Sequence, residues 1–295
     1  AHFSEQRLLV VGDAMLDRYV FGTVERISPA APVPILHARA SSTQAGGAGN
    51  TARNAAGLGA SVRLLTVLGA DTVGEELTGL IRNGNVEPFV VRDASRPTVE
   101  KMRFLQQSHQ LLRVDREDEQ PISPDIERRV LECVEQALPG VSGIIVSDYA
   151  KGTITPLLGR TLVERSRSAG IPLAADVKPA NARSLRGATF MSPNLREGRS
   201  FVAREPGEST RPEEIAAEIA RAFDADVYLT LAAEGIYVHC QSGECGLVPQ
   251  VHARDVADVS GAGDTAIAVI TLALLSGATP LEAAELANAA AAVVV

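Results

Sequence analysis

A glycine-rich turn near the end of the chain carries the first candidate for chemistry. It reads Ser260-Gly261-Ala262-Gly263-Asp264-Thr265 and stands directly before a long apolar stretch that predicts a helix. Unpaired N–H groups at a helix start, together with the helix dipole, favour a bound anion such as phosphate. A carboxylate beside that anion is useful if it accepts a proton from an attacking hydroxyl, so Asp264 is a candidate general base. Taken alone, the motif fits an ordinary helix start equally well.

A second glycine-rich turn, Gln44-Ala45-Gly46-Gly47-Ala48-Gly49-Asn50, also opens a predicted helix. Its glycines expose main-chain donors, and the Asn50 amide can donate to and accept from a polyol. By itself such a turn is a weak signal. The first strand is followed by 12–17, Gly-Asp-Ala-Met-Leu-Asp, and not by the dinucleotide fingerprint, and the sequence has no Walker-type loop. These absences disfavour a dinucleotide-dependent oxidoreductase.

Carboxylates and cations that suit a phosphorylated sugar are spread along the chain. Asp13 and Asp17 lie at or just beyond the end of the first predicted strand, where carboxylates can accept hydrogen bonds from sugar hydroxyls. Asp148 follows a buried strand in the same way. Asp17 could instead be a solvated turn residue, and Asp148 a helix cap. Three cations could hold a phosphate or be rim charges only: Lys101, Arg103 and Lys178.

The elements that must position these residues alternate between strand and helix. Candidate strands are 7–13, 62–68, 143–147, 172–176, 189–192 and 226–231, and helical patterns occupy 47–59, 71–84, 124–138, 155–169, 211–224, 262–276 and 280–295. A hairpin is expected at 235–249. The pattern predicts one α/β domain over 1–295, with a doubly wound, mostly parallel sheet. Two half-exposed segments of short strands, 16–40 and 98–116, are expected to form a small inserted sheet that acts as a lid.

Composition limits the classes of partner. The 295 residues are 45% hydrophobic, contain no Trp and carry a net charge of −8, which disfavours nucleic acid or an anionic membrane as the main partner. Three cysteines are too few for a disulfide scaffold, and no stretch resembles a signal peptide, so a cytoplasmic protein is expected. His239, Cys240 and Cys245 lack a fourth ligand, so no metal site is expected there.

The two glycine-rich turns occur together with a third element, Asn194-Leu195-Arg196-Glu197. In this order and at this wide separation, the three motifs resemble those of the ribokinase-like, PfkB-type carbohydrate kinases, and the resemblance covers essentially the whole chain. It implies that Asp264 is the catalytic base and that N–H groups of Gly261, Ala262 and Gly263 stabilise the transferring phosphoryl group.

The same resemblance implies ATP and Mg²⁺ as cofactors. Asn194 and Glu197 would organise the metal through its water ligands, since Mg²⁺ keeps much of its hydration shell. The residues that it implies at the nucleotide are Asn194, Glu197, Thr230, Gly235, Gly261, Gly263 and Asn288. Those that it implies at the acceptor are Asp13, Asp17, Gly46, Gly47, Asn50, Lys101, Arg103, Asp148 and Lys178.

Four blocks resemble one subfamily, the D-glycero-β-D-manno-heptose 7-phosphate kinases of lipopolysaccharide-core precursor synthesis. The blocks are 12–19, 26–34, 101–103 with 110–115, and 147–152. The resemblance implies phosphorylation of the anomeric hydroxyl to give a 1,7-bisphosphate. Fructose 6-phosphate or ribose as acceptor, and a non-catalytic sugar- or nucleotide-sensing module, remain alternatives.

The sequence departs from this pattern in two places. Val177 replaces the usual Pro after Asp176, and Ala232-Ala233 stand where Gly or Ser is expected near the nucleotide. Some relatives carry a fused nucleotidyltransferase, but its His-x-Gly-His signature is absent here, so a kinase alone is expected. We also expect a homodimer in which the two lids pair.

Overall fold

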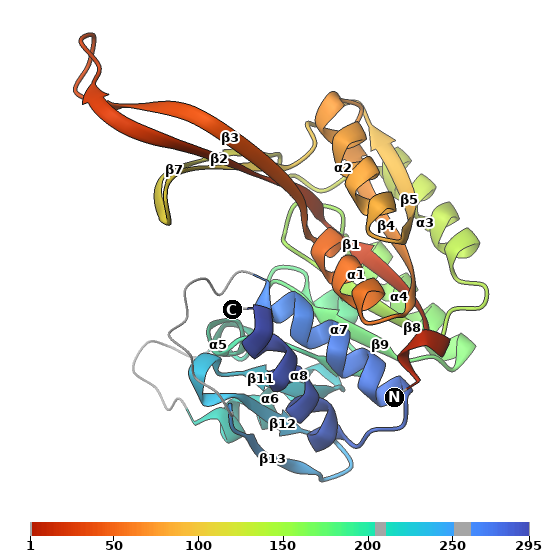
Figure 1. Ribbon diagram of the computed structural model, residues 1–295. Coiled ribbons are helices and arrows are strands. Elements are labelled where there is room, and N and C mark those ends of the chain that lie inside the picture. The colour runs from red at the N-terminus through yellow and green to blue at the C-terminus, as the bar shows by residue number, and fades with distance from the viewer. Residues whose placement is uncertain (1, 204–210, 251–260, 295) are drawn as a thin grey trace.

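The computed structural model describes residues 2–203, 211–250 and 261–294, which form an α/β body and a long projecting arm (Figure 1). In these residues the strands belong to two sheets, one of nine strands and one of four. The predicted α/β fold with a small second sheet is therefore confirmed. No helix in the described part of the chain is both long and apolar enough to span a bilayer.

The large sheet contains β1 (Arg7–Gly12), β4 (Ser61–Gly69), β5 (Val86–Asp93), β8 (Gly143–Ser147), β9 (Leu173–Asp176), β10 (Phe190–Met191), β11 (Asp226–Thr230), β12 (Ile236–His239) and β13 (Cys245–Val248). Across the sheet the order is β13-β12-β11-β10-β9-β8-β1-β4-β5. Neighbours from β5 to β11 pair in parallel, whereas β12 pairs antiparallel with both β11 and β13. The sheet is mostly parallel, as predicted.

Helices cover both faces of this sheet. One face packs against α1 (Ala48–Gly57), α2 (Thr72–Asn83), α7 (Ala262–Leu275) and α8 (Pro280–Val294), and the other against α3 (Pro124–Ala137), α4 (Pro156–Ala169) and α6 (Pro212–Phe223). In β1, Leu8 and Val10 pack toward the first group, whereas Leu9 and Val11 pack toward the second. Because successive side chains alternate between faces, a strand buried on both sides reads as a continuous apolar run.

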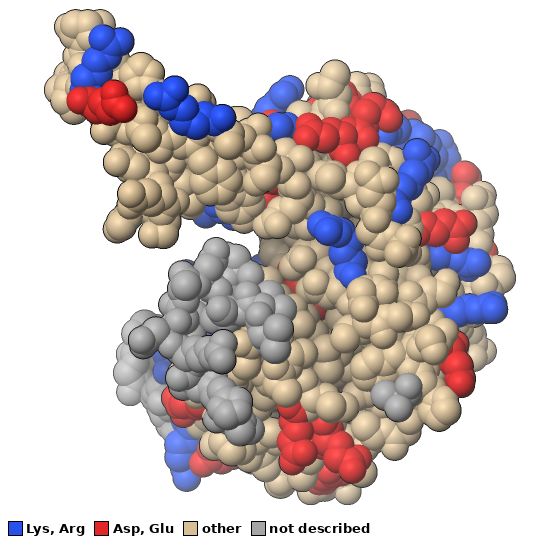
Figure 2. Space-filling model, viewed as in Figure 1, with Lys and Arg blue, Asp and Glu red and all other residues tan. Residues whose placement is uncertain are grey.

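The small sheet contains β2 (Ala14–Ile27), β3 (Pro34–Gly47), β6 (Glu100–Gln106) and β7 (His109–Arg116), in the order β3-β2-β6-β7. The expectation of short strands over 16–40 is wrong, because β2 and β3 each have 14 residues. Their prolines interrupt neither strand: Pro29 and Pro32 lie in the turn between them, and Pro34 is the first residue of β3. This small sheet, with the β2–β3 hairpin as its longest part, forms the projecting arm. The arm lies over a hollow on one side of the body (Figure 2).

The carboxyl ends of the parallel strands meet along one edge of the large sheet. Asp13 follows β1, Asp148 follows β8 and Asp176 ends β9, and these three strands are neighbours. Main-chain hydrogen bonds continue past the strand ends, from Asp13 N–H to the Ser147 carbonyl and from Asp148 N–H to the Asp176 carbonyl. Parallel pairing therefore gathers carboxylates from distant parts of the sequence at one edge, where ligands bind in this fold class.

Two elements were not predicted from the sequence. The strand β5 contains Pro88, which argues against a strand, but β5 lies at the edge of the sheet, where a missing N–H is tolerated. The short helix α5 (Leu195–Phe201) begins at the Asn194 motif. Three short 3₁₀ turns complete the described elements: η1 (Phe3–Glu5), η2 (Ala182–Leu185) and η3 (Ala232–Glu234).

Candidate active site

The carboxylate of Asp264 lies in the first turn of α7 and is almost fully buried. Three side chains donate hydrogen bonds to it. Asn50 Nδ2 lies 2.8 Å from one oxygen, and Thr51 Oγ1 and the Tyr149 hydroxyl lie 2.9 and 2.7 Å from the other. Two of these donors come from α1 and one from the turn after β8. The carboxylate is thus held in one orientation by segments that are far apart in the sequence.

The glycine-rich turn before α7 takes the conformation that an anion site needs. Gly261 has φ +89°, and a Cβ there would lie 2.9 Å from Asn50 Nδ2. The first intrahelical bond runs from Thr265 N–H to the Gly261 carbonyl. The N–H groups of the three preceding residues, Ala262, Gly263 and Asp264, have no acceptor within the helix. The preceding part of the predicted motif, 258–260, lies outside the described residues.

The other glycine-rich turn joins the small sheet to α1. Gly47 has φ +58°, and a Cβ on Gly46 would overlap the carboxylate of Asp17. Asp17 forms an ion pair with Arg103 of β6. The turn therefore brings together acceptor residues predicted on three strands, which are Asp17 of β2, Gly46 and Gly47 of β3 and Arg103 of β6. It also leads directly to Asn50, which donates to Asp264.

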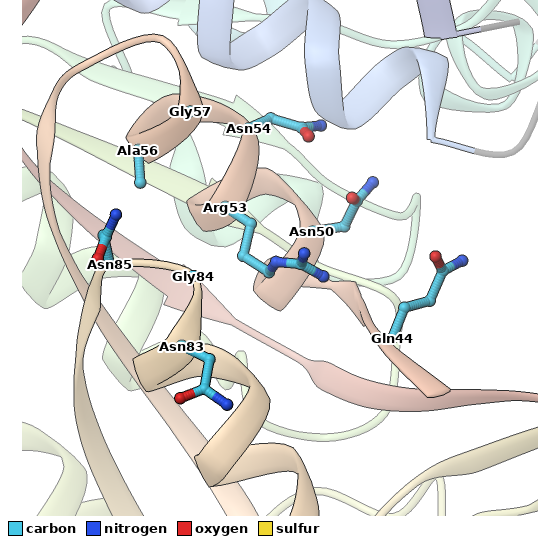
Figure 3. Close-up of a pocket in the computed structure, with 9 residues that line it drawn as sticks. All are labelled: Gln44, Asn50, Arg53, Asn54, Ala56, Gly57, Asn83, Gly84 and Asn85. Carbon is cyan, nitrogen blue, oxygen red and sulfur yellow. The ribbon is translucent and has the colours of Figure 1, made fainter. Parts of the chain in front are cut away.

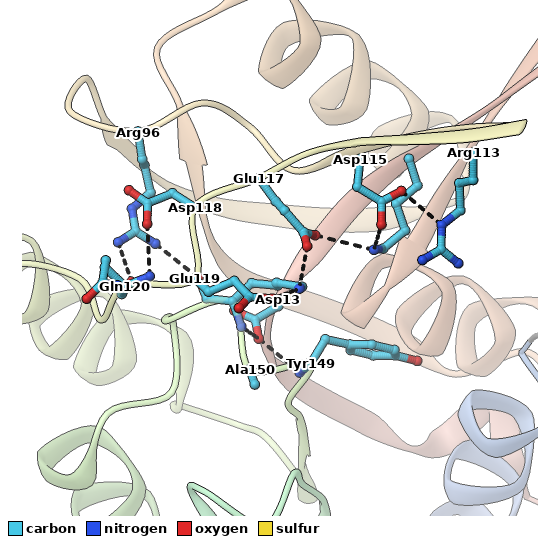
Figure 4. A network of polar contacts seen from close by, with 12 residues as sticks. Asp13, Arg96, Arg113, Asp115, Glu117, Asp118, Glu119, Gln120, Tyr149 and Ala150 are labelled. Carbon is cyan, nitrogen blue, oxygen red and sulfur yellow. Dashed lines mark hydrogen bonds and ion pairs between the residues drawn. The ribbon is translucent and has the colours of Figure 1, made fainter.

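Asp13 organises the turn that carries Tyr149. Its buried carboxylate accepts main-chain hydrogen bonds from Tyr149, Lys151 and Thr153, at 2.9, 3.0 and 3.1 Å. Figure 4 shows Asp13 beside Tyr149. These bonds fix the path of the chain after β8 and so the direction of the Tyr149 side chain toward Asp264. The structure gives Asp13 a positioning role, while its contact with a sugar stays a prediction.

Asp148 is also buried, and its carboxylate holds the start of its own turn and the loop after β9. It accepts hydrogen bonds from Ala150 N–H at 2.8 Å, from Lys178 N–H at 3.1 Å and from Asn181 Nδ2 at 3.0 Å. Burial, and then the negative charge of Asp13, raise the pKa of Asp148 to about 6. The raised pKa shows how closely carboxylates are gathered at this edge of the sheet.

Asp176, at the end of β9, is the most perturbed of these carboxylates. Burial, and then the charge of Glu197, raise its pKa to about 8. Among the described residues no donor forms a hydrogen bond with its side chain. A carboxylate that lacks donors and faces other carboxylates would gain most from a bound cation. Asp176 was not among the site residues predicted from the sequence.

Asn194 and Glu197 form a capping box at the start of α5. Glu197 N–H donates to Asn194 Oδ1 at 2.9 Å, and Asn194 N–H donates to Glu197 Oε2 at 3.1 Å. The other oxygen of Glu197 accepts from Lys178 Nζ at 2.5 Å, and that ammonium lies 5.4 Å from the centre of the Tyr149 ring. Lys178 therefore links the Glu197 side of the site to the residues around Asp264.

The cations predicted to hold a sugar phosphate already have carboxylate partners. Lys101 Nζ lies 3.2 Å from Asp115 and 3.3 Å from Glu117, and Lys151 Nζ lies 2.8 Å from Glu117 (Figure 4). Arg103 pairs with Asp17, and Lys178 with Glu197. Their role at a phosphate stays a prediction, and it would require a phosphate to compete with these carboxylates.

The residues predicted at the nucleotide lie along the other half of the sheet. Thr230 ends β11 and pairs with Asn194 through an isolated parallel bridge. Gly235 has φ +105° in the turn between β11 and β12, where a Cβ would overlap the Val248 carbonyl. Asn288 is buried in α8, and its amide donates to the Val248 carbonyl at 2.9 Å. Gly235 and Asn288 thus shape the main chain, and their contact with a nucleotide stays a prediction.

Two residues at Asp264 were missed in the sequence analysis. Thr51 directly follows Asn50, and Tyr149 lies within the 147–152 block. Both residues therefore stand in or directly beside motifs that the sequence shows. What the sequence could not show is that helix α1 and the turn after β8, about a hundred residues apart, each supply a hydroxyl donor to the same carboxylate.

The environment of Asp264 suits a general base. Burial raises the pKa of its carboxyl, and hydrogen bonds from Asn50, Tyr149 and Thr51 act in the opposite direction. A carboxylate with a raised pKa takes up a proton more readily than an ordinary one. Beside N–H groups that can bind phosphate, it could deprotonate a hydroxyl that attacks the phosphorus atom.

The chain resembles known proteins over nearly its whole length. The sequence pattern described as pfkB family carbohydrate kinase matches residues 5–295. The chain is 39% identical over 295 residues to the bifunctional protein HldE of Paramagnetospirillum magneticum and 41% identical over 300 residues to that of Caulobacter sp. strain K31. These alignments cover 98% and 99% of the chain but only 59% and 60% of the relatives. The expectation of a kinase without a second activity therefore stays a prediction.

Solved structures share the fold. Phosphofructokinase-2 from Escherichia coli, in its tetrameric inhibited form, superposes with a TM-score of 0.80 at 20% identity and covers 98% of this chain and 93% of its own. Ribokinase from Arabidopsis thaliana, complexed with ribose and ATP, gives a TM-score of 0.71 at 22% identity and covers 97% and 91%. At these identities the similarity establishes the fold alone.

Proposed function

Because the chain belongs to the pfkB family of carbohydrate kinases, we propose that it transfers the terminal phosphoryl group of ATP to a sugar hydroxyl that Asp264 deprotonates. The observation that carries this proposal is the Asp264 carboxylate, buried beside a helix start with free N–H groups and fixed by Asn50, Thr51 and Tyr149.

The reaction follows from these positions. Asp264 accepts the proton of the acceptor hydroxyl, whose oxygen forms a bond to the γ-phosphorus as the bond to the β,γ-bridging oxygen breaks, and ADP leaves. The N–H groups of Ala262 and Gly263 stabilise the charge on the transferring group. The protein chiefly positions the reactants and complements their charge, as phosphoryl transfer requires.

The donor set on the nucleotide side fits Mg²⁺. Asp176 lacks hydrogen-bond donors among the described residues, and its pKa is raised by burial and by the charge of Glu197. Glu197 in turn forms a capping box with Asn194. Hard oxygen donors are what Mg²⁺ prefers, and it usually keeps several waters as well. Bound there with ATP, Mg²⁺ would neutralise phosphate charge. Asp176, Glu197 and Asn194 would hold it, directly or through water.

We propose D-glycero-β-D-manno-heptose 7-phosphate as the acceptor, with its anomeric hydroxyl as the group phosphorylated. Support comes from the sequence blocks that resemble kinases of this sugar. The block 147–152 contains Tyr149, which donates to Asp264, and the Asp17–Arg103 ion pair joins the blocks 12–19 and 101–103. Residues 110–115 lie in β7, which pairs with β6. The fourth, 26–34, forms the distant tip of the β2–β3 hairpin (Figure 1).

The small sheet is proposed to act as a lid and as a dimer interface. Asp17 and Arg103 lie on the face that carries the acceptor residues. The opposite face carries an apolar stripe in register across three strands: Val20, Met102, Phe104, Leu112 and Val114. Leu112 is 57% exposed and Val114 39% exposed. A second copy of this stripe is the simplest partner that would cover it, and a closed lid would exclude water from the transfer.

An acceptor panel tests the proposed reaction. With Mg-ATP, we expect the heptose 7-phosphate to be converted to a 1,7-bisphosphate, seen as ADP release and as a new anomeric phosphate signal by ³¹P NMR. Turnover of fructose 6-phosphate or ribose without turnover of the heptose would show that the acceptor is wrong. Nucleotide binding with no turnover of any sugar would favour a sensing module instead.

Replacing the base removes the proton acceptor without changing its shape. Asp264→Asn should lower kcat by about 10²–10⁴-fold, because general-base catalysis usually contributes that much. ATP affinity, measured by calorimetry, should stay close to that of the parent protein, since the N–H groups of the turn remain. Near-normal kcat in this variant would exclude Asp264 as the base.

Tyr149→Phe should move the acid side of the pH–activity profile to higher pH. Asp264 must be ionised to act, so activity is present above its pKa and lost as the pH falls through it. The Tyr149 hydroxyl stabilises the ionised form, and its removal raises the pKa further. The measurement is kcat/KM against pH. A variant that is less stable but has an unshifted profile would show that Tyr149 has a packing role only.

A charge in the apolar stripe should separate the proposed dimer. Leu112→Glu is expected to give a monomeric mass by light scattering at micromolar concentration, because apposed carboxylates would be desolvated. Leu157→Glu, on α4 at 43% exposure, makes the same change on a different surface and should leave the mass unchanged. A monomeric parent protein would overturn the proposal.

A further inference from the structure

A polar pocket of about 350 Å³ adjoins the candidate active site and shares Asn50 with it. It is formed between α1 and the turn that joins α2 to β5 (Figure 3). The lining consists of Gln44, Asn50, Arg53, Asn54, Ala56, Gly57, Asn83, Gly84 and Asn85. All these residues are within the described part of the chain.

The lining is rich in hydrogen-bond donors and contains no acidic residue. Five of its nine lining residues carry a side-chain amide, and Arg53 adds a guanidinium. The chain carries a net charge of −8, whereas this concave site is lined by one cation and no carboxylate. Three of these amides already donate to groups outside the pocket: Gln44 to Tyr19, Asn50 to Asp264 and Asn54 to Thr265. The Arg53 guanidinium and the amides of Asn83 and Asn85 can donate to the acceptor oxygens of a phosphate group.

Gly84 allows Arg53 to lie across the pocket wall. A Cβ at position 84 would lie only 2.8 Å from Arg53 Cγ and 3.0 Å from its Nε. Gly84 has φ −84°, which any residue adopts, so space and not backbone conformation is what glycine provides here. No carboxylate of the described residues forms an ion pair with Arg53. Its charge is therefore available to a ligand, unlike those of Lys101 and Lys178.

The pocket shares its wall with the candidate active site. Asn50 lines it and also donates to Asp264 at 2.8 Å, and Asn54 donates to Thr265 Oγ1 at 2.9 Å. Gln44, at the opposite rim, donates to the Tyr19 hydroxyl on the small sheet. Arg53 follows Asn50 by one helical turn, a rise of about 4.5 Å. A phosphate held at Arg53 would thus lie within reach of a sugar whose hydroxyl faces Asp264.

We propose that this pocket binds the phosphate group of a small molecule, with Arg53 as its charged ligand. Two sources share this chemistry: the phosphate that the acceptor sugar already carries, and a free phosphate that acts as an effector. The first source rests on the proposed function, whereas phosphate binding itself does not.

The binding test uses inorganic phosphate and the whole chain, with the nucleotide site filled by a non-hydrolysable ATP analogue. Phosphate should raise the Tm of the parent protein, and Arg53→Gln should weaken the apparent phosphate affinity by about 10- to 100-fold, the usual cost of losing a charged hydrogen bond. Gly84→Ala should weaken it also, because the new methyl group displaces Arg53. Arg160→Gln, an equal charge change on exposed α4, should respond like the parent protein.

Kinetics distinguish the two sources. If the acceptor supplies the phosphate, Arg53→Gln should raise KM for the sugar phosphate by about 10- to 100-fold while kcat and KM for ATP change little. If free phosphate is the ligand, it should change the turnover of the parent protein at saturating acceptor, and Arg53→Gln should abolish that response. Equal phosphate affinity in Arg53→Gln and Arg160→Gln overturns the proposal, whether or not the chain phosphorylates the heptose.

Discussion

The buried carboxylate of Asp264 is the feature on which the site depends. An ionised carboxylate away from water is costly unless donors replace its hydration. Here the donors are Asn50 and Thr51 of α1 and Tyr149 from the turn after β8. Their contacts tie both segments to the start of α7. The same contacts that permit the charge to be buried therefore fix the distance between the acceptor side of the site and the anion-binding turn.

Electrostatic repulsion along the sheet edge explains several neighbouring features. Parallel pairing places Asp13, Asp148 and Asp176 on adjacent strands, and each must be compensated separately. The Asp13 carboxylate accepts three main-chain hydrogen bonds. The Asp148 carboxylate accepts two main-chain hydrogen bonds and one from the Asn181 side-chain amide. The Asp176 carboxylate accepts none from the described residues, and its pKa is raised to about 8. The incompletely compensated end of this row is the one next to Glu197, where a cation and nucleotide phosphates are expected.

The sequence predicted the fold well because its strands are short, apolar and bounded by polar ends. The predicted range 143–147 is β8, and the range 124–138 differs from α3 by one residue. The failures have local causes. Pro88 concealed the edge strand β5, and three prolines concealed how far β2 and β3 extend. For the site, motifs identified Asp264 and its turn, but Thr51 and Tyr149 were not identified, because their role exists only through long-range packing.

Charge pairing was the least predictable feature, and it changes how the acceptor site is understood. Lys101 and Arg103 looked like phosphate ligands because they are cations near a cleft, but sequence does not show which carboxylates lie opposite. In the structure Lys101 is shared by Asp115 and Glu117, and Glu117 also pairs with Lys151 of the turn that carries Tyr149. These ion pairs connect the small sheet to the turn that carries Tyr149, and Tyr149 in turn orients the proposed general base, Asp264. Cations near this cleft therefore hold the protein together first, and a separate, unpaired cation is better suited to hold a ligand.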